Sequence, residues 1–154
     1  MSRRDLIRMT DDEVTAFLRE SHPMNIATYN HDGTIHLVAM WYAPLPDGRI
    51  GFETFAKSQK IKNLRRDPRI TALVEDGHSY DQLRGVELVG EAEVSEDVEL
   101  LMEIARSVVG RYQPEIGGQD IEAVAQMMVQ KRAAVVFTPS KVVSWDHTKL
   151  GGTY

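Results

Sequence analysis

The segment FETFAKSQKIKNLRRDPRITAL, residues 52–73, reads as the end of one strand, a short helix and the start of the next strand. Ser58 is a suitable N-cap for this helix, and Ile61 and Leu64, three residues apart, give it a buried side. Pro68 ends the helix, because the residue before a proline is disfavoured in the α region. The segment therefore predicts two strands that are joined through a helix beginning near Ser58.

Polar and basic side chains crowd around the start of this predicted helix, namely Thr54, Lys57, Ser58 and Lys60. A helix N-terminus presents unpaired backbone N–H groups and about half a positive charge. Hydroxyl and ammonium groups at the same place make a binding site for a phosphate. The alternative is a basic, solvated helix that only connects two strands, and the spacing alone does not decide between the two.

Short strands joined by turn signals dominate the rest of the chain. A capping box at Thr10 predicts a first helix, and further helices are expected after Ser95 and from Asp120. The predicted strands, the last two divided by Pro139, are residues 24–29, 34–43, 49–55, 69–74, 83–94, 133–138 and 141–145. Gly85 and Gly90 are expected at bulges or bends that let the sheet curl. The pattern favours a mainly β (α+β) fold whose antiparallel sheet closes toward a barrel.

Composition narrows the class of protein. A length of 154 residues fits a single domain over residues 1–154, and 42% hydrophobic with 27% charged residues is ordinary for a globular chain. A formal net charge of −5 argues against nucleic acid as the main partner, without excluding a local basic pocket for a phosphorylated molecule. We expect a soluble, cytoplasmic protein with no membrane partner, because no signal peptide or membrane-spanning apolar run is present.

Common catalytic and metal-binding motifs are absent from the sequence. The chain has no cysteine, which excludes disulfides, thiol catalysis and cysteine-ligated metals. Its five histidines show no ligand spacing such as HExxH, so no metal site is expected. Neither a GxGxxG nor a P-loop nor a GxSxG motif occurs.

The order of motifs resembles the pyridoxamine-phosphate-oxidase-like split-barrel family. The likeness covers about residues 24–95 and includes Trp41-Tyr42, DGRIGFETFAKSQKIKNLRRDPRITALVEDG at residues 47–77 and VELVGEAEV at residues 86–94. It is strongest for the branch that contains the flavin/deazaflavin oxidoreductases of actinobacteria. The resemblance implies an antiparallel split β-barrel with peripheral helices, and a homodimer whose cofactor clefts lie between the subunits.

The same resemblance assigns a cofactor site. In this family the segment containing Thr54, Ser58, Lys60 and Asn63 holds the phosphate of FMN or of the deazaflavin coenzyme F420. The FMN oxidases place an arginine on the preceding strand, where this chain has only His36 as a titratable side chain. Because an imidazole is a weaker phosphate partner than a guanidinium, the departure favours F420 over FMN.

The implied activity is an F420H2-dependent oxidoreductase that passes a hydride to a small organic acceptor. The alternatives are an FMN-binding oxidoreductase of the pyridoxamine-phosphate-oxidase type and a non-catalytic cofactor-binding dimer. Since the cofactor carries the difficult chemistry in hydride transfer, no catalytic residue is assigned.

Four further residues have a possible cofactor role and an ordinary structural alternative. Met40 and Trp41 lie on the strand that runs beneath the flavin or deazaflavin ring in similar proteins, and either could instead belong to the core. Trp145, near the end of the last predicted strand, could reach the partner's cofactor or pack in a dimer interface. His36 could contact phosphate or substrate, or face solvent.

Overall fold

Seven strands form one antiparallel sheet in the computed structural model, which describes residues 2–152. The strands are β1 (Met24–Tyr29), β2 (Ile35–Met40), β3 (Ala43–Pro44), β4 (Ile50–Phe55), β5 (Arg69–Asp76), β6 (Arg84–Ser95) and β7 (Arg132–Asp146). The helices are α1 (Arg3–Ile7), α2 (Asp11–Arg19), α3 (Gln59–Arg66), α4 (Val98–Tyr112) and α5 (Gly118–Met128), with two 3₁₀ turns, η1 (Tyr80–Gln82) and η2 (His147–Leu150). The expected mainly β, α+β fold class is confirmed.

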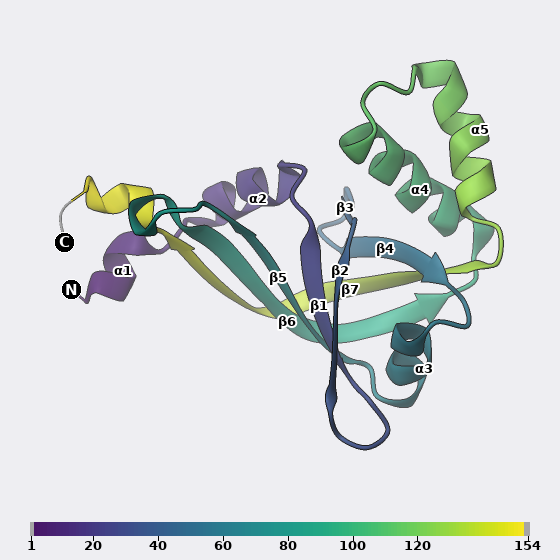
Figure 1. Ribbon diagram of the computed structural model, residues 1–154, viewed down its shortest axis with the longest axis horizontal. Coiled ribbons are helices and arrows are strands. Elements are labelled where there is room, and N and C mark those ends of the chain that lie inside the picture. Colours follow the sequence, from purple (N-terminus) through teal and green to yellow (C-terminus); the bar gives the residue numbers. More distant parts are fainter. Residues whose placement is uncertain (1, 153–154) are drawn as a thin grey trace.

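The order of strands explains why the sheet curls (Figure 1). It runs β2-β1-β5-β6-β7-β4-β3, so that β2 and β3 are the two edges. Only Trp41 and Tyr42 separate these edge strands in the sequence, which forces the edges toward each other. Tyr42 is fully buried, and its hydroxyl donates a hydrogen bond to the Leu18 carbonyl at 2.7 Å. The sheet is therefore a nearly closed antiparallel barrel, as the sequence predicted.

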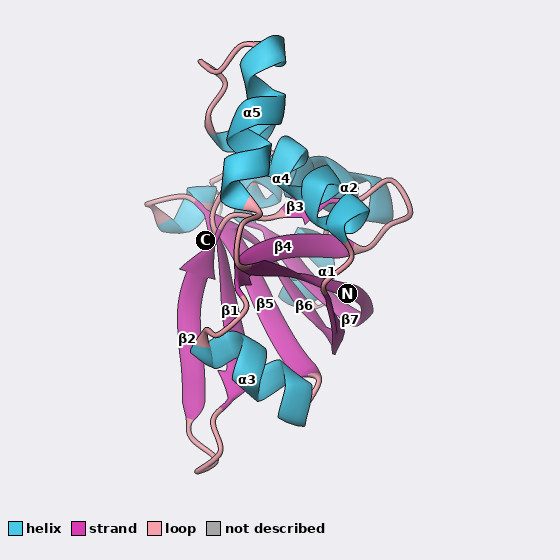
Figure 2. Ribbon diagram, turned by 90° about the vertical axis from the view of Figure 1, so that its right-hand side faces the viewer, coloured by secondary structure: helices cyan, strands magenta, loops and turns pink. Residues whose placement is uncertain are grey.

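The core lies inside the curl, and helices cover the sheet on both sides. Phe17 and Leu18 of α2 and Ile61 and Leu64 of α3 join the strands in the main core. On the outer side, α4 packs on β4 and β7, and α5 packs on α4. Figure 2 shows α4 and α5 stacked beyond β4, away from α3. This division leaves one end of β4 between α3 and the α5 side of the molecule.

The predicted break at Pro139 is wrong, because β7 is continuous. The β6–β7 ladder shifts register between Val89 and Gly90, which pair with Lys141 and Pro139 respectively. Ser140 is the extra residue of this bulge, and a bulge accommodates a proline because it interrupts the ladder of N–H donors. The expectation that Gly90 lies at a bulge is thereby confirmed.

Helix starts were predicted with mixed accuracy. Thr10 makes the expected capping box with Glu13. α3 has Ser58 at its N-cap, although the Ser58 side chain makes no capping bond. The cap of α4 is Asp97 instead of Ser95, because the Asp97 carboxylate accepts from the Leu100 N–H at 2.8 Å. Two other differences concern α1, which was not expected, and α5, which begins two residues before the predicted start.

The outer face of the sheet carries exposed apolar side chains where β2 and β1 meet. Tyr29 pairs with Ile35 and Ala27 pairs with Leu37 on this face, and Ile35 and Leu37 are 54% and 68% exposed. In residues 2–152 every helix is too short or too polar to cross a bilayer. The exposed apolar side chains thus belong to a sheet surface.

Candidate functional site

The end of β4 and the start of α3 carry three of the polar side chains that the sequence singled out. Thr54 is 4% exposed and accepts a hydrogen bond from Lys60 Nζ at 3.1 Å. Ser58 Oγ is buried and, within residues 2–152, has no hydrogen-bond partner. A buried hydroxyl without a partner loses its hydration without compensation, and a ligand oxygen would satisfy it once the side chains that cover it move aside. We call Thr54, Ser58 and Lys60 the anion seat.

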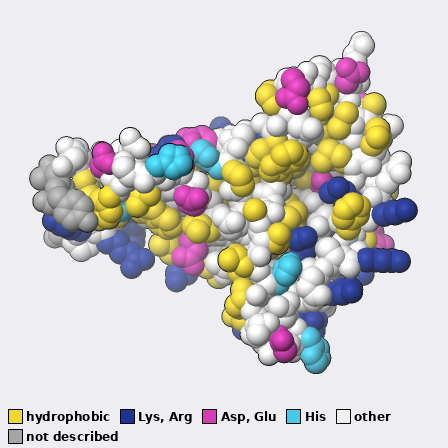
Figure 3. Space-filling view, in the orientation of Figure 1, with side chains coloured by type: hydrophobic (Ala, Val, Ile, Leu, Met, Phe, Trp, Pro, Cys, Tyr) yellow, Lys and Arg dark blue, Asp and Glu magenta, His cyan; other side chains and the backbone are white. Residues whose placement is uncertain are grey.

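The two lysines near the seat differ in exposure. Lys60 is partly buried, and burial together with the nearby positive charge of Arg132 holds its pKa below the ordinary lysine value. Lys57 is exposed. No acidic residue occupies the first turn of α3 to neutralise these charges. Figure 3 shows Lys and Arg side chains gathered on the right-hand side, over the end of β4 and α3. The seat is thus a locally positive region in an acidic chain.

Asn63, which the resemblance placed among the cofactor contacts, is in the interior instead. It is fully buried, and its amide donates to Thr28 Oγ1 at 3.1 Å and to Asn30 Oδ1 at 3.0 Å. Its Oδ1 accepts from Gln59 Nε2 at 2.9 Å. The side chain therefore fixes α3 against the end of β1, and it offers no surface to a ligand in this structure.

A cleft opens near the same end of β4. It is a cavity of about 410 Å³, a volume in the range of small-molecule sites. Its lining residues are Pro23, Ala39, Met40, Trp41, Glu53, Met128 and Arg132. Trp41 is 44% exposed, and its ring stacks on Tyr112 with centroids 5.0 Å apart and an interplanar angle of 2°. Met40 and Trp41, the two residues expected beneath the cofactor ring, thus share one wall of the cleft.

An ion pair that the sequence did not reveal lies in this cleft. Arg132 Nη1 donates to Glu53 Oε2 at 2.7 Å, and the guanidinium carbon lies 4.5 Å from the centroid of the Phe55 ring. Burial raises the pKa of Glu53, while Arg132 opposes that rise. Register explains the contact, because Glu53 pairs with Ala134 and Phe55 with Arg132 across neighbouring strands. The one available signal was a glutamate inside the largely apolar run IGFETF.

His36 and Trp145 lie in different regions. His36 is half-buried and pairs with Thr28, the residue to which Asn63 donates, so it is on the face of the sheet that α3 covers. Trp145 lies across Gly85 on the outer face, near the opposite end of β7 from Arg132. Thirteen strand residues span about 40 Å. One chain therefore does not bring Trp145 to the anion seat.

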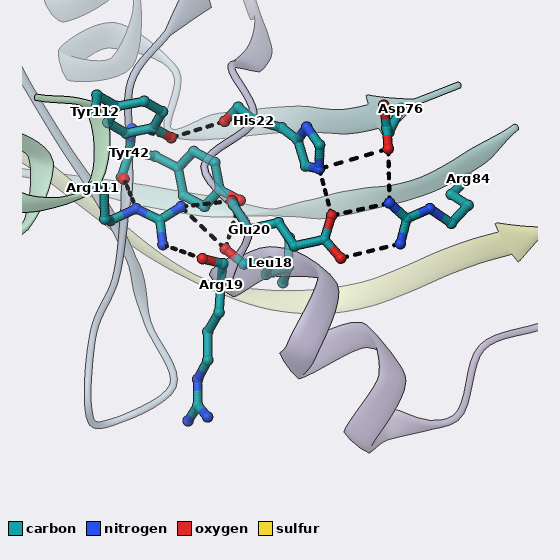
Figure 4. Close-up of polar contacts among 9 residues, drawn as sticks. All are labelled: Leu18, Arg19, Glu20, His22, Tyr42, Asp76, Arg84, Arg111 and Tyr112. Carbon is teal, nitrogen blue, oxygen red and sulfur yellow. Dashed lines mark hydrogen bonds and ion pairs between the residues drawn. The ribbon is translucent and has the colours of Figure 1, made fainter. Parts of the chain in front are cut away.

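A second polar cluster holds the end of α2 against the sheet (Figure 4). Arg84 Nη2 bonds Glu20 at 3.0 Å and Asp76 at 2.7 Å, and His22 Nε2 lies 2.6 Å from Glu20. Single ligand atoms of Glu20, His22 and Asp76 fall within 4.8 Å of one another, an arrangement that the sequence spacing did not suggest. Because Arg84 bridges the two carboxylates, a side chain already supplies the cation of this cluster.

Comparison with known proteins identifies the family to which this architecture belongs. A sequence model described as pyridoxamine 5'-phosphate oxidase matches residues 10–146. The chain belongs to this family. The resemblance that its motifs suggested is confirmed, and with it the split-barrel fold.

Solved structures of the same fold come from proteins that are described in different ways. A conserved hypothetical protein of Mycobacterium tuberculosis is 42% identical, with a TM-score of 0.91 over 100% of this chain and 95% of that one. An F420 reductase is 22% identical, with a TM-score of 0.62 over 82% of this chain and 93% of the other. An FAD-binding protein of Mesorhizobium loti is 16% identical, with a TM-score of 0.60 over 88% and 92% of the two chains. The last two show the shared fold alone.

Proposed function

We propose that this chain is an F420H2-dependent oxidoreductase that transfers a hydride between the deazaflavin and a small organic acceptor. The observation that supports this most strongly is the anion seat, where the buried Ser58 hydroxyl has no hydrogen-bond partner in residues 2–152 and Lys60, two residues further on, donates to Thr54. These groups fit the phosphate of a coenzyme, because an ammonium and two hydroxyls give charge-assisted hydrogen bonds to its oxygens. When bound, the coenzyme supplies the hydride chemistry.

The chain's own residues bind the coenzyme and orient its ring. Lys60, Ser58 and Thr54 hold the phosphate end, and the exposed Lys57 adds positive charge beside them. Met40 and Trp41 form the wall against which a flat ring rests. In this proposal no side chain is required to act as an acid or a base.

The choice of F420 over FMN rests on the strand that precedes the seat. His36 is the candidate phosphate partner on the strand where the FMN oxidases carry an arginine, and it faces the α3 side of the sheet. An F420 reductase has the same fold, which agrees with the choice. An FMN-dependent oxidoreductase is the second candidate, and the family description and the FAD-binding neighbour favour it.

A homodimer in the cytoplasm is part of the same proposal. The exposed apolar pairs on the outer sheet face, with Ile35 and Leu37 at their centre, suit contact with a second copy. In such a dimer Trp145 would serve the partner's cofactor cleft, since it is far from the seat of its own chain. A chain without cysteine suits a reducing compartment.

The test is a side-by-side titration of the purified protein with F420 and with FMN, followed by fluorescence. Tighter binding of F420, and oxidation of its reduced form when an acceptor is added, are the expected results. Tighter binding of FMN would favour the second candidate, an FMN-dependent oxidoreductase. Binding of neither coenzyme would refute both.

Lys60→Ala supplies the sharper measurement in the same titration. Loss of one charge-assisted contact is expected to weaken F420 binding by about 1–3 kcal/mol. Lys62→Ala is the matched control, because Lys62 lies two residues further along α3 and is exposed. Its affinity should stay within about twofold of the unmodified protein, a difference below 0.5 kcal/mol. Equal affinities for all three proteins would remove Lys60 from the site.

A further inference from the structure

Arg132 lines the cleft, but the proposed cofactor contacts give its side chain no role. Its side chain is 26% exposed and lines the cavity, whereas the Glu53 side chain to which it is bound is only 4% exposed. An arginine carries five N–H groups. Glu53 accepts from Nη1, and residues 2–152 show no hydrogen-bond acceptor for the other nitrogens of this side chain.

Two contacts hold the guanidinium at the cleft wall. Glu53 Oε2 accepts a hydrogen bond from Arg132 Nη1 at 2.7 Å, and the guanidinium carbon lies 4.5 Å from the centroid of the Phe55 ring. A planar guanidinium fixed in this way keeps its remaining donors in one plane, the arrangement that suits a carboxylate with two oxygens. Glu53 therefore acts as a positioning residue for Arg132.

Charge and shape both favour an organic anion. Glu53 contributes one negative charge to this end of β4, while Arg132 and Lys60 contribute two positive charges, so the balance is positive. Five of the seven lining residues carry apolar side chains, with Trp41 and Met40 among them. A ligand that fits has a flat apolar body and one carboxylate at its edge.

We infer that the Arg132 edge of the cleft binds the carboxylate of the hydride acceptor, and that Arg132 thereby selects acceptors of one class, small conjugated organic acids. The flat body of the acid lies against the coenzyme ring when the coenzyme occupies the Met40–Trp41 wall, and against that wall itself when no coenzyme is bound. The inference rests on the proposed function only in treating the bound acid as the acceptor. The recognition of the carboxylate is a property of Glu53, Arg132 and the apolar wall, and it can be measured without any coenzyme.

The probes are trans-cinnamate and its neutral amide, which share a flat conjugated body and differ in the charge of one group. Binding is followed by the indole N–H resonances in NMR spectra, because the chain has only two tryptophans and Trp41 lines the cleft. Trp41→Phe identifies which resonance belongs to the cleft. Cinnamate should shift that resonance and bind about tenfold more tightly than the amide, the effect of a charge-assisted hydrogen bond.

Two variants test the role of Arg132. Glu53→Gln/Arg132→Gln removes both charges together, which avoids leaving a buried charge without a partner. It should abolish the preference for cinnamate over the amide. Arg132→Lys keeps the charge and loses the planar fork, so the preference should fall by about threefold. An undiminished preference in the double variant, or no preference in the unmodified protein, would overturn the inference.

F420 titrations of the same variants separate the two proposals. We expect both variants to bind F420 within about twofold of the unmodified protein, while Lys60→Ala loses F420 and keeps cinnamate. If the double variant loses F420 as Lys60→Ala does, Arg132 belongs to the cofactor site and the inference fails while the proposed function stands. If the protein binds cinnamate as described but no coenzyme, the proposed function fails and the carboxylate site stands.

Discussion

Gly85 shows how one residue can be fixed by a side chain far away in the sequence. It pairs with Trp145, and a Cβ placed on Gly85 would lie 2.1 Å from Cζ2 of the Trp145 ring. Of the bulge or bend expected at Gly85, a bulge is not formed, since the register is continuous there. The glycine instead makes room for an indole ring to lie flat across the strand.

Gly85→Ala should lower the free energy of unfolding by about 1–3 kcal/mol, because the ring must move to admit the methyl group. Gly110→Ala is the matched control, since Gly110 lies within α4 and a Cβ there would meet nothing within 4 Å. That change should raise stability by about 0.5–1 kcal/mol. Urea unfolding of both variants measures the difference, and equal effects would contradict this account of Gly85.

At the scale of elements, the end of α2 depends on side chains from two other parts of the chain. Arg111 of α4 donates to the carbonyl oxygens of Leu18, Arg19 and Glu20, at the end of the helix where carbonyls lose their intrahelical partners (Figure 4). Arg84 of β6 then binds the Glu20 carboxylate. The two arginines attach α2 to the sheet and to α4 at once.

The Arg84 contacts make stability depend on pH. A hydrogen bond from Arg84 holds the pKa of Asp76 below its ordinary value of 3.8. Burial would raise the pKa of Glu20, but hydrogen bonds from Arg84 and His22 outweigh it and hold the pKa below 4.5. Carboxyl groups with a lowered folded-state pKa stabilise the fold above their unfolded pKa and lose that contribution as the pH falls.

Arg84→Gln should therefore reduce the free energy of unfolding at pH 7, and the difference from the unmodified protein should shrink between about pH 5 and pH 3. Urea titrations at a series of pH values measure it. Arg65→Gln is the control, because the Arg65–Glu96 pair is largely exposed. A difference for Arg84→Gln that stays constant down to pH 3 would show that the lowered carboxyl pKa values do not matter for stability.

At the scale of the whole molecule, the outer sheet face is the surface that a second copy is proposed to cover. Leu37 is 68% exposed on that face. Leu37→Lys should convert a dimer to a monomer in sedimentation experiments, because a charge buried in an apolar interface costs several kcal/mol. Val98→Lys is the control, since Val98 is equally exposed, at 66%, but lies on α4. A Leu37→Lys protein that stays dimeric would place the interface elsewhere.

Local signals in the sequence predicted most of the elements, and contacts between distant residues account for most errors. The strand over residues 24–29 and the helix start at Ser58 follow from neighbouring residues, and both were predicted. Pro139 was misjudged because a proline signal is local, whereas the bulge that accommodates it depends on the pairing of β7 with β6.

The residues of the candidate site also fall into two groups, those that neighbouring sequence predicted and those that depend on distant contacts. Thr54, Ser58 and Lys60 lie within seven residues, so a strand followed by a helix is enough to bring them together. Glu53 and Arg132 are 79 residues apart, and only the β4–β7 register shows that they meet. Asn63 was expected at the cofactor because of the family resemblance of its segment, but the depth at which its helix packs is a tertiary property.

The two-residue connection between β2 and β3 has a consequence for the cleft that contains Trp41. Three Cα–Cα steps from Met40 to Ala43 reach at most about 11 Å when fully extended. The Cα atoms at the joined ends of β2 and β3 therefore cannot move further apart than this, whatever motion the rest of the barrel undergoes. Covalent geometry thus keeps Trp41, which lies on this connection and lines the cleft, close to both edges of the sheet.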